Sequence, residues 1–390
     1  MSLIVRVAAR GEGVTADGRH AAFAAPGDTL TEGGAIVPGP HHQLPPCRHF
    51  PRCGGCQLQH LDDGAYGAFV ADRIAGALAA HDLSAQIRPA ALSPPRTRRR
   101  ATLHAEKGGK LGFAEEKSHA IVDIAECHIL APELFALVAP LRGLLRTLGL
   151  KRRADVHLAL VDQGADVLVT GLAAQSLHAA EAITRFCERH GIARFAVDDG
   201  LGPETRWEPD AVTVTFGGVA VPFPHAAFLQ ATPEGEAALV AAVREATAGA
   251  ATVADLFAGL GTFALALPAR VYAAEGARDA LLSLKAAANR GGRLVFAEHR
   301  DLYRRPLTAA ELDRFEAIVI DPPRAGARDQ MCALAATTCR RLAYVSCNPS
   351  SFARDAKTLC EGGWRLDWIQ PVGQFRWSTH VELAAAFSRQ

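Results

Sequence analysis

The sequence predicts an α/β protein in which a doubly wound, mostly parallel sheet follows a β-rich region. From about residue 235 onward, strand-like and helix-like segments alternate strictly. Before that point, residues 98–125 and 153–221 are rich in strand-forming residues. We therefore expect three parts: a short β module (1–46), a β-rich central region (47–225) and a doubly wound domain (226–390).

The N-terminal two parts contain few helical patterns. Short β-like pieces lie among Gly, Pro and His in residues 1–46, and a cysteine-rich loop occupies residues 47–60. A stripe of apolar residues predicts a helix over residues 66–81, which we expect to pack on the C-terminal domain. The stretch 132–149, rich in Leu and Ala, predicts a second helix between the two β-rich segments.

In the C-terminal part, strand patterns and helix patterns alternate up to the last residues. Ligands of such sheets bind at the carboxyl ends of the strands, so the residues there are the candidate site. The expected elements are a helix (235–248), a strand ending at 255–257, a glycine loop with a helix, a strand ending at Glu275, a helix (277–289), a strand (294–297), a strand (315–320), a helix (327–339), a strand (341–346), a helix (350–360) and two strands (365–370 and 381–387).

Composition sets limits on location and partners. The 390 residues are 49% hydrophobic and carry a net charge of +1, so any nucleic-acid surface must be local. The nine cysteines, three of them within residues 47–56, indicate a metal site and free thiols in a reducing compartment. No apolar window has membrane-spanning length. We expect a cytoplasmic protein without a membrane or an obligate protein partner.

A glycine turn follows the first strand of the doubly wound domain. Gly259, Gly261 and Thr262 lie in the stretch Asp255-Leu-Phe-Ala-Gly-Leu-Gly-Thr-Phe263. Glycine lets the backbone approach a ligand, although short glycine turns also close many αβ units without binding anything. The third glycine of a dinucleotide motif is absent, which disfavours NAD and favours S-adenosylmethionine, a cofactor without pyrophosphate.

Carboxylates end the next two strands. Glu275 lies about 20 residues beyond the start of the glycine motif, where a carboxylate accepts ribose hydroxyls in nucleoside-binding sheets. Asp301 follows the third strand and is a candidate for the adenine amino group. On spacing alone, Asp301 is nearly as well explained as a solvated loop carboxylate that binds no cofactor.

Cys347 is the candidate nucleophile because it ends an apolar strand in Ser346-Cys347-Asn348-Pro349, just before a helix. A buried cysteine is usually a small hydrophobe, but a helix N-terminus lowers a thiol pKa. Asp321-Pro322-Pro323-Arg324 ends the preceding strand and is expected to line the same cleft. Arg324 stands where amino-methylating enzymes commonly place an aromatic residue, which favours a different acceptor atom.

A nucleophilic thiol is the group that methylation of a pyrimidine at C5 requires. C5 is a weak nucleophile until a thiolate adds to C6, and a base must afterwards remove the C5 proton. Glu382, in His380-Val381-Glu382 at the start of the last strand, is the candidate base. A surface carboxylate is the equally weighted alternative.

Four cysteines form a candidate metal site. Cys47, Cys53 and Cys56 lie close together, and Cys127 lies farther along the chain. Four thiolates suit a [4Fe–4S] cluster, and they also suit a structural zinc ion. The spacing by itself does not separate the two.

The densest positive run is Arg96-Thr97-Arg98-Arg99-Arg100. In a β segment, alternation would project Arg98 and Arg100 to one side, toward an RNA phosphate backbone, whereas most such runs are simply solvated.

The chain resembles the RNA 5-methyluridine methyltransferases that act on 23S ribosomal RNA and transfer RNA. The resemblance covers residue 47 to the C-terminus and is strongest to the iron–sulfur-containing, ribosomal branch. It lies in the motifs Cys-Gly-Gly-Cys-Gln-Leu-Gln-His (53–60), Phe228-Leu229-Gln230, 255–263, 321–324, 346–349 and 380–382.

The resemblance implies a class I, Rossmann-like methyltransferase domain that uses S-adenosylmethionine to methylate a uridine in RNA, most simply 23S rRNA. It implies that Cys347 is the nucleophile and Glu382 the base, and that Phe228 stacks near the target uracil. It also implies a [4Fe–4S] cluster on the four cysteines. The residues expected around cofactor and base are Gln230, Phe257, Glu275, Asp301 and Asp321.

The N-terminal part departs from the family. Relatives often begin with an OB-like or TRAM-like barrel, whereas residues 1–46 are too few for a full barrel. Two alternative functions remain open from the sequence: methylation of cytosine C5 or of an exocyclic amine in nucleic acid, and a non-catalytic RNA-binding assembly factor.

Overall fold

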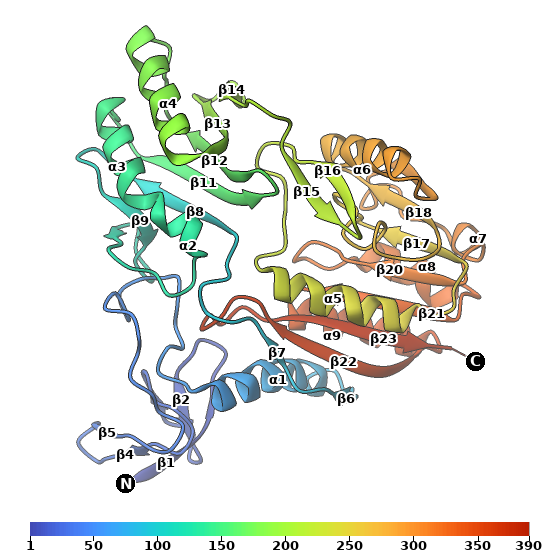
Figure 1. Cartoon of the computed structure of the whole chain (residues 1–390). Helices are drawn as coiled ribbons and strands as arrows, with labels where there is room; N and C mark the ends of the chain where they lie inside the picture. The colour runs from blue at the N-terminus through green and yellow to red at the C-terminus, as the bar shows by residue number, and fades with distance from the viewer. Residues whose placement is uncertain (390) are drawn as a thin grey trace.

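The computed structural model describes residues 1–389 and contains three main sheets arranged along the chain (Figure 1). The first sheet has the strand order β3-β2-β1-β4-β5 and a small core around Ile4 and Leu30. Its strands are short: β1 (Ser2–Val7), β2 (Gly13–Thr15), β3 (His20–Ala21), β4 (Thr29–Leu30) and β5 (Ile36–Val37). Residues 2–37 thus form a compact β module.

The second sheet has the order β10-β9-β8-β11-β12-β13-β14. Its strands are β8 (Arg100–Ala105), β9 (Leu111–Ala114), β10 (Ile121–Asp123), β11 (Ala154–Val161), β12 (Gly164–Thr170), β13 (Ile192–Asp198) and β14 (Glu204–Trp207). Helices α2 (Pro132–Ala136), α3 (Val138–Thr147) and α4 (Leu177–His190) accompany it. The predicted β-rich central region is therefore present.

Two predictions for this region were wrong in detail. The helix expected over 132–149 is divided into α2 and α3 at Leu137. The ring of Pro140 would clash with the carbonyl of Ala136 in a continuous helix, and proline is tolerated in the first turn of a new one. Helix α4 interrupts the stretch 153–221, for which the sequence analysis predicts only β structure. Two sequence features mark this helix: Ser176 caps its N-terminus, and Gly191 takes a left-handed conformation after its last turn.

The third sheet is the doubly wound one, with the order β19-β18-β17-β20-β21-β23-β22-β6. Its first five strands in this order are mutually parallel, and β23 runs antiparallel to both β21 and β22. The strands are β17 (Thr252–Leu256), β18 (Arg270–Glu275), β19 (Val295–His299), β20 (Ala317–Ile320), β21 (Arg341–Ser346), β22 (Arg365–Gly373), β23 (Glu382–Ser388) and the short β6 (Gln86–Ile87) and β7 (Ala91–Leu92).

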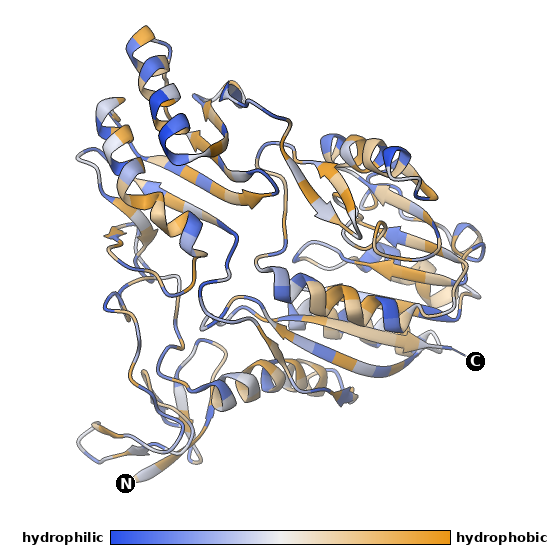
Figure 2. Ribbon diagram, in the orientation of Figure 1, coloured by the Kyte–Doolittle hydropathy of each residue, from blue (hydrophilic) through white to orange (hydrophobic). Residues whose placement is uncertain are grey.

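Helices cover both faces of this sheet, and strands such as β17 and β20 are mostly orange, hence apolar, in Figure 2. Alternate residues serve opposite cores: Ile318 and Ile320 pack with α1, α8 and α9, whereas Val319 packs with α5 and α6. The elements are α1 (Asp63–Ala79), α5 (Pro233–Ala246), α6 (Arg278–Arg290), α7 (Ala309–Leu312), α8 (Arg328–Ala336), α9 (Pro349–Glu361) and the hairpin β15 (Thr213–Phe216) and β16 (Val219–Pro222). The predicted fold class is confirmed.

Helix α1 packs on α9 and β22, as expected, and β6 and β7 extend the sheet beyond β22. Residues 63–92 therefore contribute to the doubly wound domain although they precede the central sheet. The helix expected after the glycine loop is wrong: residues 259–269 form turns, and Pro268 follows closely enough to stop any helix before β18. No helix among residues 1–389 is long and apolar enough to cross a membrane.

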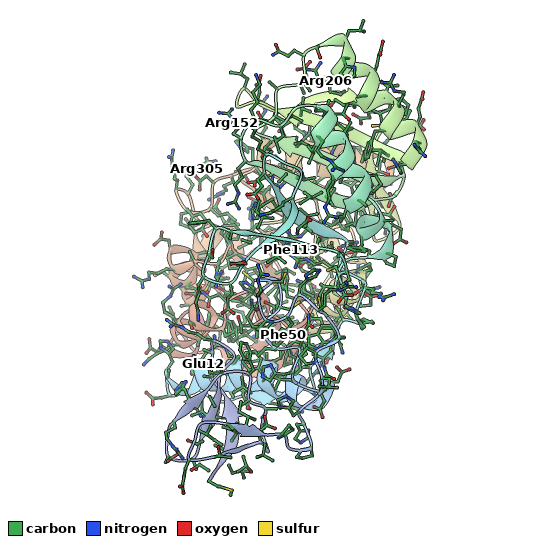
Figure 3. All side chains as sticks on the ribbon, turned by 90° about the vertical axis from the view of Figure 1, so that its left-hand side faces the viewer. Glu12, Phe50, Phe113, Arg152, Arg206 and Arg305 are labelled. Carbon is green, nitrogen blue, oxygen red and sulfur yellow. The ribbon has the colours of Figure 1, made fainter. Side chains whose placement is uncertain are left out.

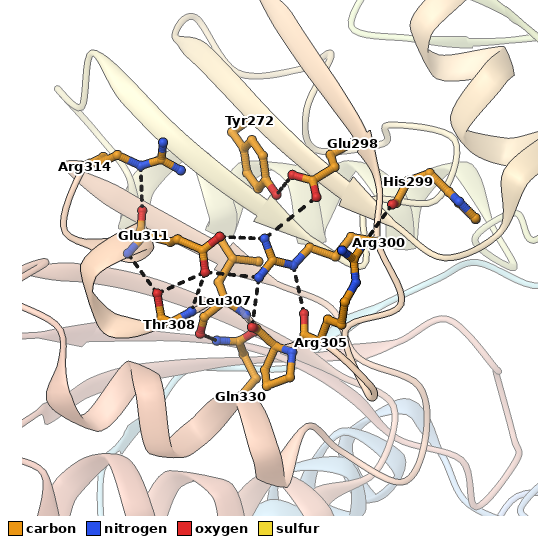
Figure 4. A network of polar contacts seen from close by, with 11 residues as sticks. Tyr272, Glu298, His299, Arg300, Arg305, Leu307, Thr308, Glu311, Arg314 and Gln330 are labelled. Carbon is orange, nitrogen blue, oxygen red and sulfur yellow. Dashed lines mark hydrogen bonds and ion pairs between the residues drawn. The ribbon is translucent and has the colours of Figure 1, made fainter.

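A polar network fixes the segment that follows β19 (Figure 4). The guanidinium of Arg300 donates to both carboxylate oxygens of Glu311, at 2.7 and 3.0 Å, and to the carbonyl of Arg305 at 2.8 Å. The Thr308 side chain accepts from the Glu311 backbone in a capping box. These bonds lower the pKa of Glu311 to about 2 and tie the end of β19 to helix α7.

Arg194 of β13 forms a buried ion pair with Asp166 of β12, with N–O distances of 2.8 and 3.0 Å. Removing one member of a buried pair leaves an uncompensated charge. We predict that Arg194→Ala lowers the free energy of unfolding by about 3 kcal/mol in urea titrations. The exposed pair of Arg185 and Glu181 is the control, and Arg185→Ala should cost less than about 1 kcal/mol. Equal losses in the two variants would contradict this account.

Candidate active site

A cavity of about 890 Å³ lies at the carboxyl edge of the doubly wound sheet. Its walls come from the loops after β17, β18, β20 and β21, from the segment before α5 and from the start of β8. The predicted residues in its lining are Arg100, Phe228, Gln230, Phe257, Gly259, Thr262, Glu275, Asp321, Arg324, Cys347 and Glu382. Residues far apart in the sequence thus meet in one space, as the rule for ligands of parallel sheets predicts.

The glycine turn is held open by its own backbone and by Glu275. Phe257 takes the left-handed conformation, with φ of 64°, which is uncommon for a residue with a side chain. The Glu275 carboxylate accepts from the backbone N–H of Gly259 at 2.7 Å and of Ala277 at 2.6 Å. These two bonds hold the Glu275 carboxylate between the loops that follow β17 and β18, in the lining of the cavity.

Two predicted cofactor residues do not line the cavity. A Cβ on Gly261 would lie 2.4 Å from the Leu284 side chain, so this glycine permits close packing against α6. Asp301 is exposed, and its carboxylate accepts from the backbone N–H groups of Tyr303 and Arg304 at 3.0 and 3.2 Å. Asp301 therefore stabilises the turn of the loop that Arg300 anchors.

Strand pairing brings Cys347 and Glu382 together. In the antiparallel pair of β21 and β23, Ser346 lies opposite Leu383. Cys347, one residue farther along β21, therefore comes next to Glu382, the residue before Leu383 on β23. Glu382 is only 5% exposed. Burial, with a further contribution from Asp321, raises the pKa of Glu382 to about 8. A buried carboxyl of this pKa is suited to exchanging protons near neutral pH.

The expectation that the helix N-terminus lowers the Cys347 pKa is wrong. Burial raises the pKa of this thiol and the nearby carboxyls of Glu382 and Asp321 raise it further, whereas the charge of Arg324 and a backbone hydrogen bond lower it by less. The helix N-terminus is already occupied, because the side chain of Asn348 caps α9 by accepting from Ser350. Cys347 is therefore a thiol whose ionisation depends on a change in its surroundings.

Asp321 and Arg324 belong to the wall beside this pair. Burial raises the pKa of Asp321 to about 7. The carbonyl of Arg324 accepts from the Asn348 side chain at 3.0 Å and from the Ser351 hydroxyl at 3.1 Å. The loop after β20 is thus tied to the turn that holds the cysteine.

Phe228 and Arg100 form the outer wall. Phe228 is 62% exposed, an unusual state for a large aromatic side chain, and the guanidinium of Arg100 lies 4.6 Å from its ring centre. Gln230 is buried, and its side-chain oxygen accepts from the Gln374 amide at 2.7 Å. An exposed aromatic face beside buried polar groups is suited to stacking a planar ring.

Arg98 and Arg100 are both half-buried and line different pockets: Arg100 lines the cavity and Arg98 the pocket of the cysteines, which differs from the prediction of a shared phosphate-facing side. The guanidinium of Arg98 lies 5.4 Å from the ring centre of Phe375, and burial lowers its pKa although Cys56 and Cys127 act in the opposite direction. Arg98 therefore lies between the cavity wall and the thiols.

The four predicted cysteines, Cys47, Cys53, Cys56 and Cys127, line one enclosed pocket with Phe50, Phe113, Ile124 and Ile129. Figure 3 shows Phe113 above and Phe50 below, between the central sheet and the N-terminal module. All four are free thiols, and burial raises the pKa of Cys56 to about 12. No group of three or more His, Cys, Asp or Glu side chains within residues 1–389 is arranged to hold a metal ion.

The sequence analysis did not single out Phe375 and His380, which line the cavity with their rings 5.8 Å apart. His380 lies two residues before Glu382, so the motif itself carried a signal. Phe375 lies in a loop without periodicity and gave none.

Comparison with known proteins places these features in a family. The family model described as tRNA (uracil-5-)-methyltransferase matches residues 294–390. A protein of Zymomonas mobilis described as an RNA methyltransferase is 50% identical over the full length of both chains. The 23S rRNA (uracil(1939)-C(5))-methyltransferase of Thiobacillus denitrificans is 32% identical over 91% of this chain and 87% of its own length.

A solved structure shows the same fold. The tRNA (uracil-54, C5)-methyltransferase of Pyrococcus abyssi, in complex with S-adenosyl-L-homocysteine, superposes with a TM-score of 0.76 at 22% identity, over 99% of this chain and 100% of that one. With relatives this similar over nearly its whole length, the chain belongs to the family of RNA uracil-5-methyltransferases.

Proposed function

We propose that the protein transfers a methyl group from S-adenosylmethionine to C5 of one uridine in 23S rRNA, through a covalent bond between Cys347 and C6 of the base. The observation that carries this proposal is the placement of Cys347 beside Glu382 in one cavity. Family membership removes the alternatives of cytosine or amine methylation and of a non-catalytic factor. The choice of 23S rRNA rests on the similarity to the Thiobacillus denitrificans enzyme.

The residues present fit the cofactor. Glu275 is fixed beside the glycine turn, where a nucleoside ribose would find a carboxylate, and Phe257, Gly259 and Thr262 form the adjoining wall. When bound, S-adenosylmethionine would supply an electrophilic methyl group on its sulfonium. Gln230 and Asp321 line the same cavity as Cys347 and are the proposed polar contacts to cofactor and base.

Cys347 and Glu382 divide the chemistry between them. The Cys347 thiolate forms a bond to C6 of uracil, and the electron pair of the C5–C6 double bond moves toward C5 and O4. The electron pair on C5 would then form the bond to the methyl group, as the bond from that group to the sulfonium sulfur breaks and a neutral thioether leaves. Glu382 takes the proton from C5, the C5–C6 double bond re-forms, and the C6–S bond breaks so that the thiolate leaves. Phe228 and Arg100 would hold the face of the ring, and Arg324 would stabilise the thiolate by its charge.

We also propose that Cys47, Cys53, Cys56 and Cys127 hold a [4Fe–4S] cluster. Support comes from the donor set: four free thiols share one pocket, and the half-buried guanidinium of Arg98 lies near two of them. When bound, a cluster would cross-link the loop 47–56 to Cys127. Methyl transfer moves electron pairs and requires no one-electron carrier, so the role assigned to these residues is structural.

The first prediction concerns the nucleophile. With RNA that carries 5-fluorouridine and with S-adenosylmethionine, the wild-type enzyme should form a methylated adduct that survives denaturation, because fluorine does not leave as a proton does. Cys347→Ala should form no adduct on a denaturing gel, and Cys339→Ala, a buried cysteine outside the cavity, should react normally. Undiminished adduct in Cys347→Ala would exclude this residue as the nucleophile.

The second prediction concerns the base and its pH dependence. Glu382 must be ionised to accept the C5 proton, and with a pKa of about 8 it is mostly protonated at pH 7. Release of the methylated base should therefore accelerate about tenfold from pH 6 to pH 7 and level off above pH 8. Rapid-quench measurements of elimination would test this. Glu382→Gln should accumulate the complex with natural uridine, and a wild-type release rate in that variant would point to another base.

The third prediction concerns the cluster. Cys53→Ala should purify with less iron and sulfide, by elemental analysis and visible absorption, and should bind RNA more weakly. Affinity for S-adenosylmethionine should remain, because its proposed site lies on the doubly wound domain. Cys187→Ala, a buried cysteine of α4, is the control. Wild-type enzyme reconstituted with iron and sulfide yet lacking a bound cluster would rule out this assignment.

A further inference from the structure

The loop between β22 and β23, residues 374–381, has no regular secondary structure, yet it carries part of the cavity wall. Phe375 and His380 line the cavity from this loop, and Glu382 follows it directly. Turns without a hydrogen-bonded ladder take their conformation from contacts with neighbouring segments. The contacts that fix this loop therefore influence the shape of the proposed base site.

The loop is bound to the segment that follows the cysteines. The carbonyl of Trp377 accepts two hydrogen bonds, from the backbone N–H groups of Gln57 at 2.8 Å and Leu58 at 2.9 Å. Trp377 itself has a φ of 58°, a left-handed conformation that a large side chain adopts at an energetic cost. The surrounding contacts must hold this residue in place.

A second set of contacts comes from the N-terminal end of helix α1. Arg376 is 8% exposed, and its guanidinium pairs with the carboxylate of Asp63 and donates to the carbonyl of Ser93 at 3.1 Å. The buried hydroxyl of Tyr66, one helical turn after Asp63, donates to the carbonyl of Phe375 at 3.1 Å. Two residues of one helix turn thus hold two successive residues of the loop.

We propose that Arg376, Asp63 and Tyr66 are positioning residues, which clamp the β22–β23 loop so that Phe375 and His380 form the wall against which the target base is placed. This inference rests on the proposed function. None of the three residues lines the cavity, so they act through Phe375 and His380. The clamp couples the base site to α1 and to the cysteine loop that precedes it.

Asp63 offers a clean test because its role in folding is small. Its side chain is 65% exposed, and the N-cap of α1 is the neighbouring Asp62, whose side chain accepts from Ala65. Asp63→Asn keeps the size of the side chain and the helix cap, and it removes only the charge that holds Arg376. Tyr66→Phe removes one hydroxyl and keeps the ring.

The experiment uses the full chain with its cluster and compares Asp63→Asn, Tyr66→Phe, Arg376→Ala and Arg376→Lys with wild type. Asp72→Asn, an exposed acid on the same helix, is the matched control. We expect Asp63→Asn and Tyr66→Phe to slow covalent adduct formation with 5-fluorouridine RNA about tenfold, the effect of losing one strong hydrogen bond. The Kd for S-adenosylmethionine should stay at the wild-type value in both variants, and the Tm should stay unchanged in Asp63→Asn, whose side chain is exposed. Arg376→Lys should recover part of the rate lost in Arg376→Ala.

Wild-type adduct rates in both Asp63→Asn and Tyr66→Phe would overturn the positioning role. The same follows if the rate falls only together with the Tm or with cofactor affinity, or if Asp72→Asn loses as much as Asp63→Asn. A failure of the proposed function looks different, because then the wild-type enzyme itself would form no adduct.

Discussion

The antiparallel pairing of β23 with β21 is the constraint on which the site depends. It inserts the last strand of the chain between β21 and β22, and its register fixes Glu382 beside Cys347. A shift by one residue would turn Glu382 to the opposite face of the sheet, since side chains alternate. The buried sequence Leu383–Phe387 protects this register, because both faces of β23 are covered.

The same pairing explains the electrostatics of the site. Glu382, Asp321 and Cys347 are acidic groups that share a poorly solvated space, and each raises or is raised by its neighbours. Burial raises the pKa of all three groups, and the negative charge of Asp321 raises the pKa values of Glu382 and Cys347 further. The charge of Arg100 lowers the pKa of Glu382 and the charge of Arg324 lowers that of Cys347, so the two arginines partly offset the effect of burial.

Much of the fold followed from the sequence because buried parallel strands and amphipathic helices leave strong periodicities. β21 was predicted at its observed bounds, and the motifs at strand ends identified Cys347, Glu275 and Asp321 as neighbours. The failures have physical causes. Gly261 allows close packing against Leu284, and the carboxylate of Asp301 accepts hydrogen bonds within its own turn. Arg98 is half-buried, next to Phe375 and the thiols. The local sequence does not reveal contacts between residues that are far apart in the chain. Residues 374–381 form no regular secondary structure, so no hydrophobic periodicity pointed to this loop.

The most direct test is the identity of the product. Unmodified 23S rRNA would be incubated with purified enzyme and S-adenosylmethionine, digested, and its nucleosides quantified and mapped by mass spectrometry. The account predicts close to one 5-methyluridine per molecule, at a single position, with wild-type enzyme and none with Cys347→Ala. A methylated cytidine, a methylated amine, or 5-methyluridine formed equally well by Cys347→Ala would contradict it.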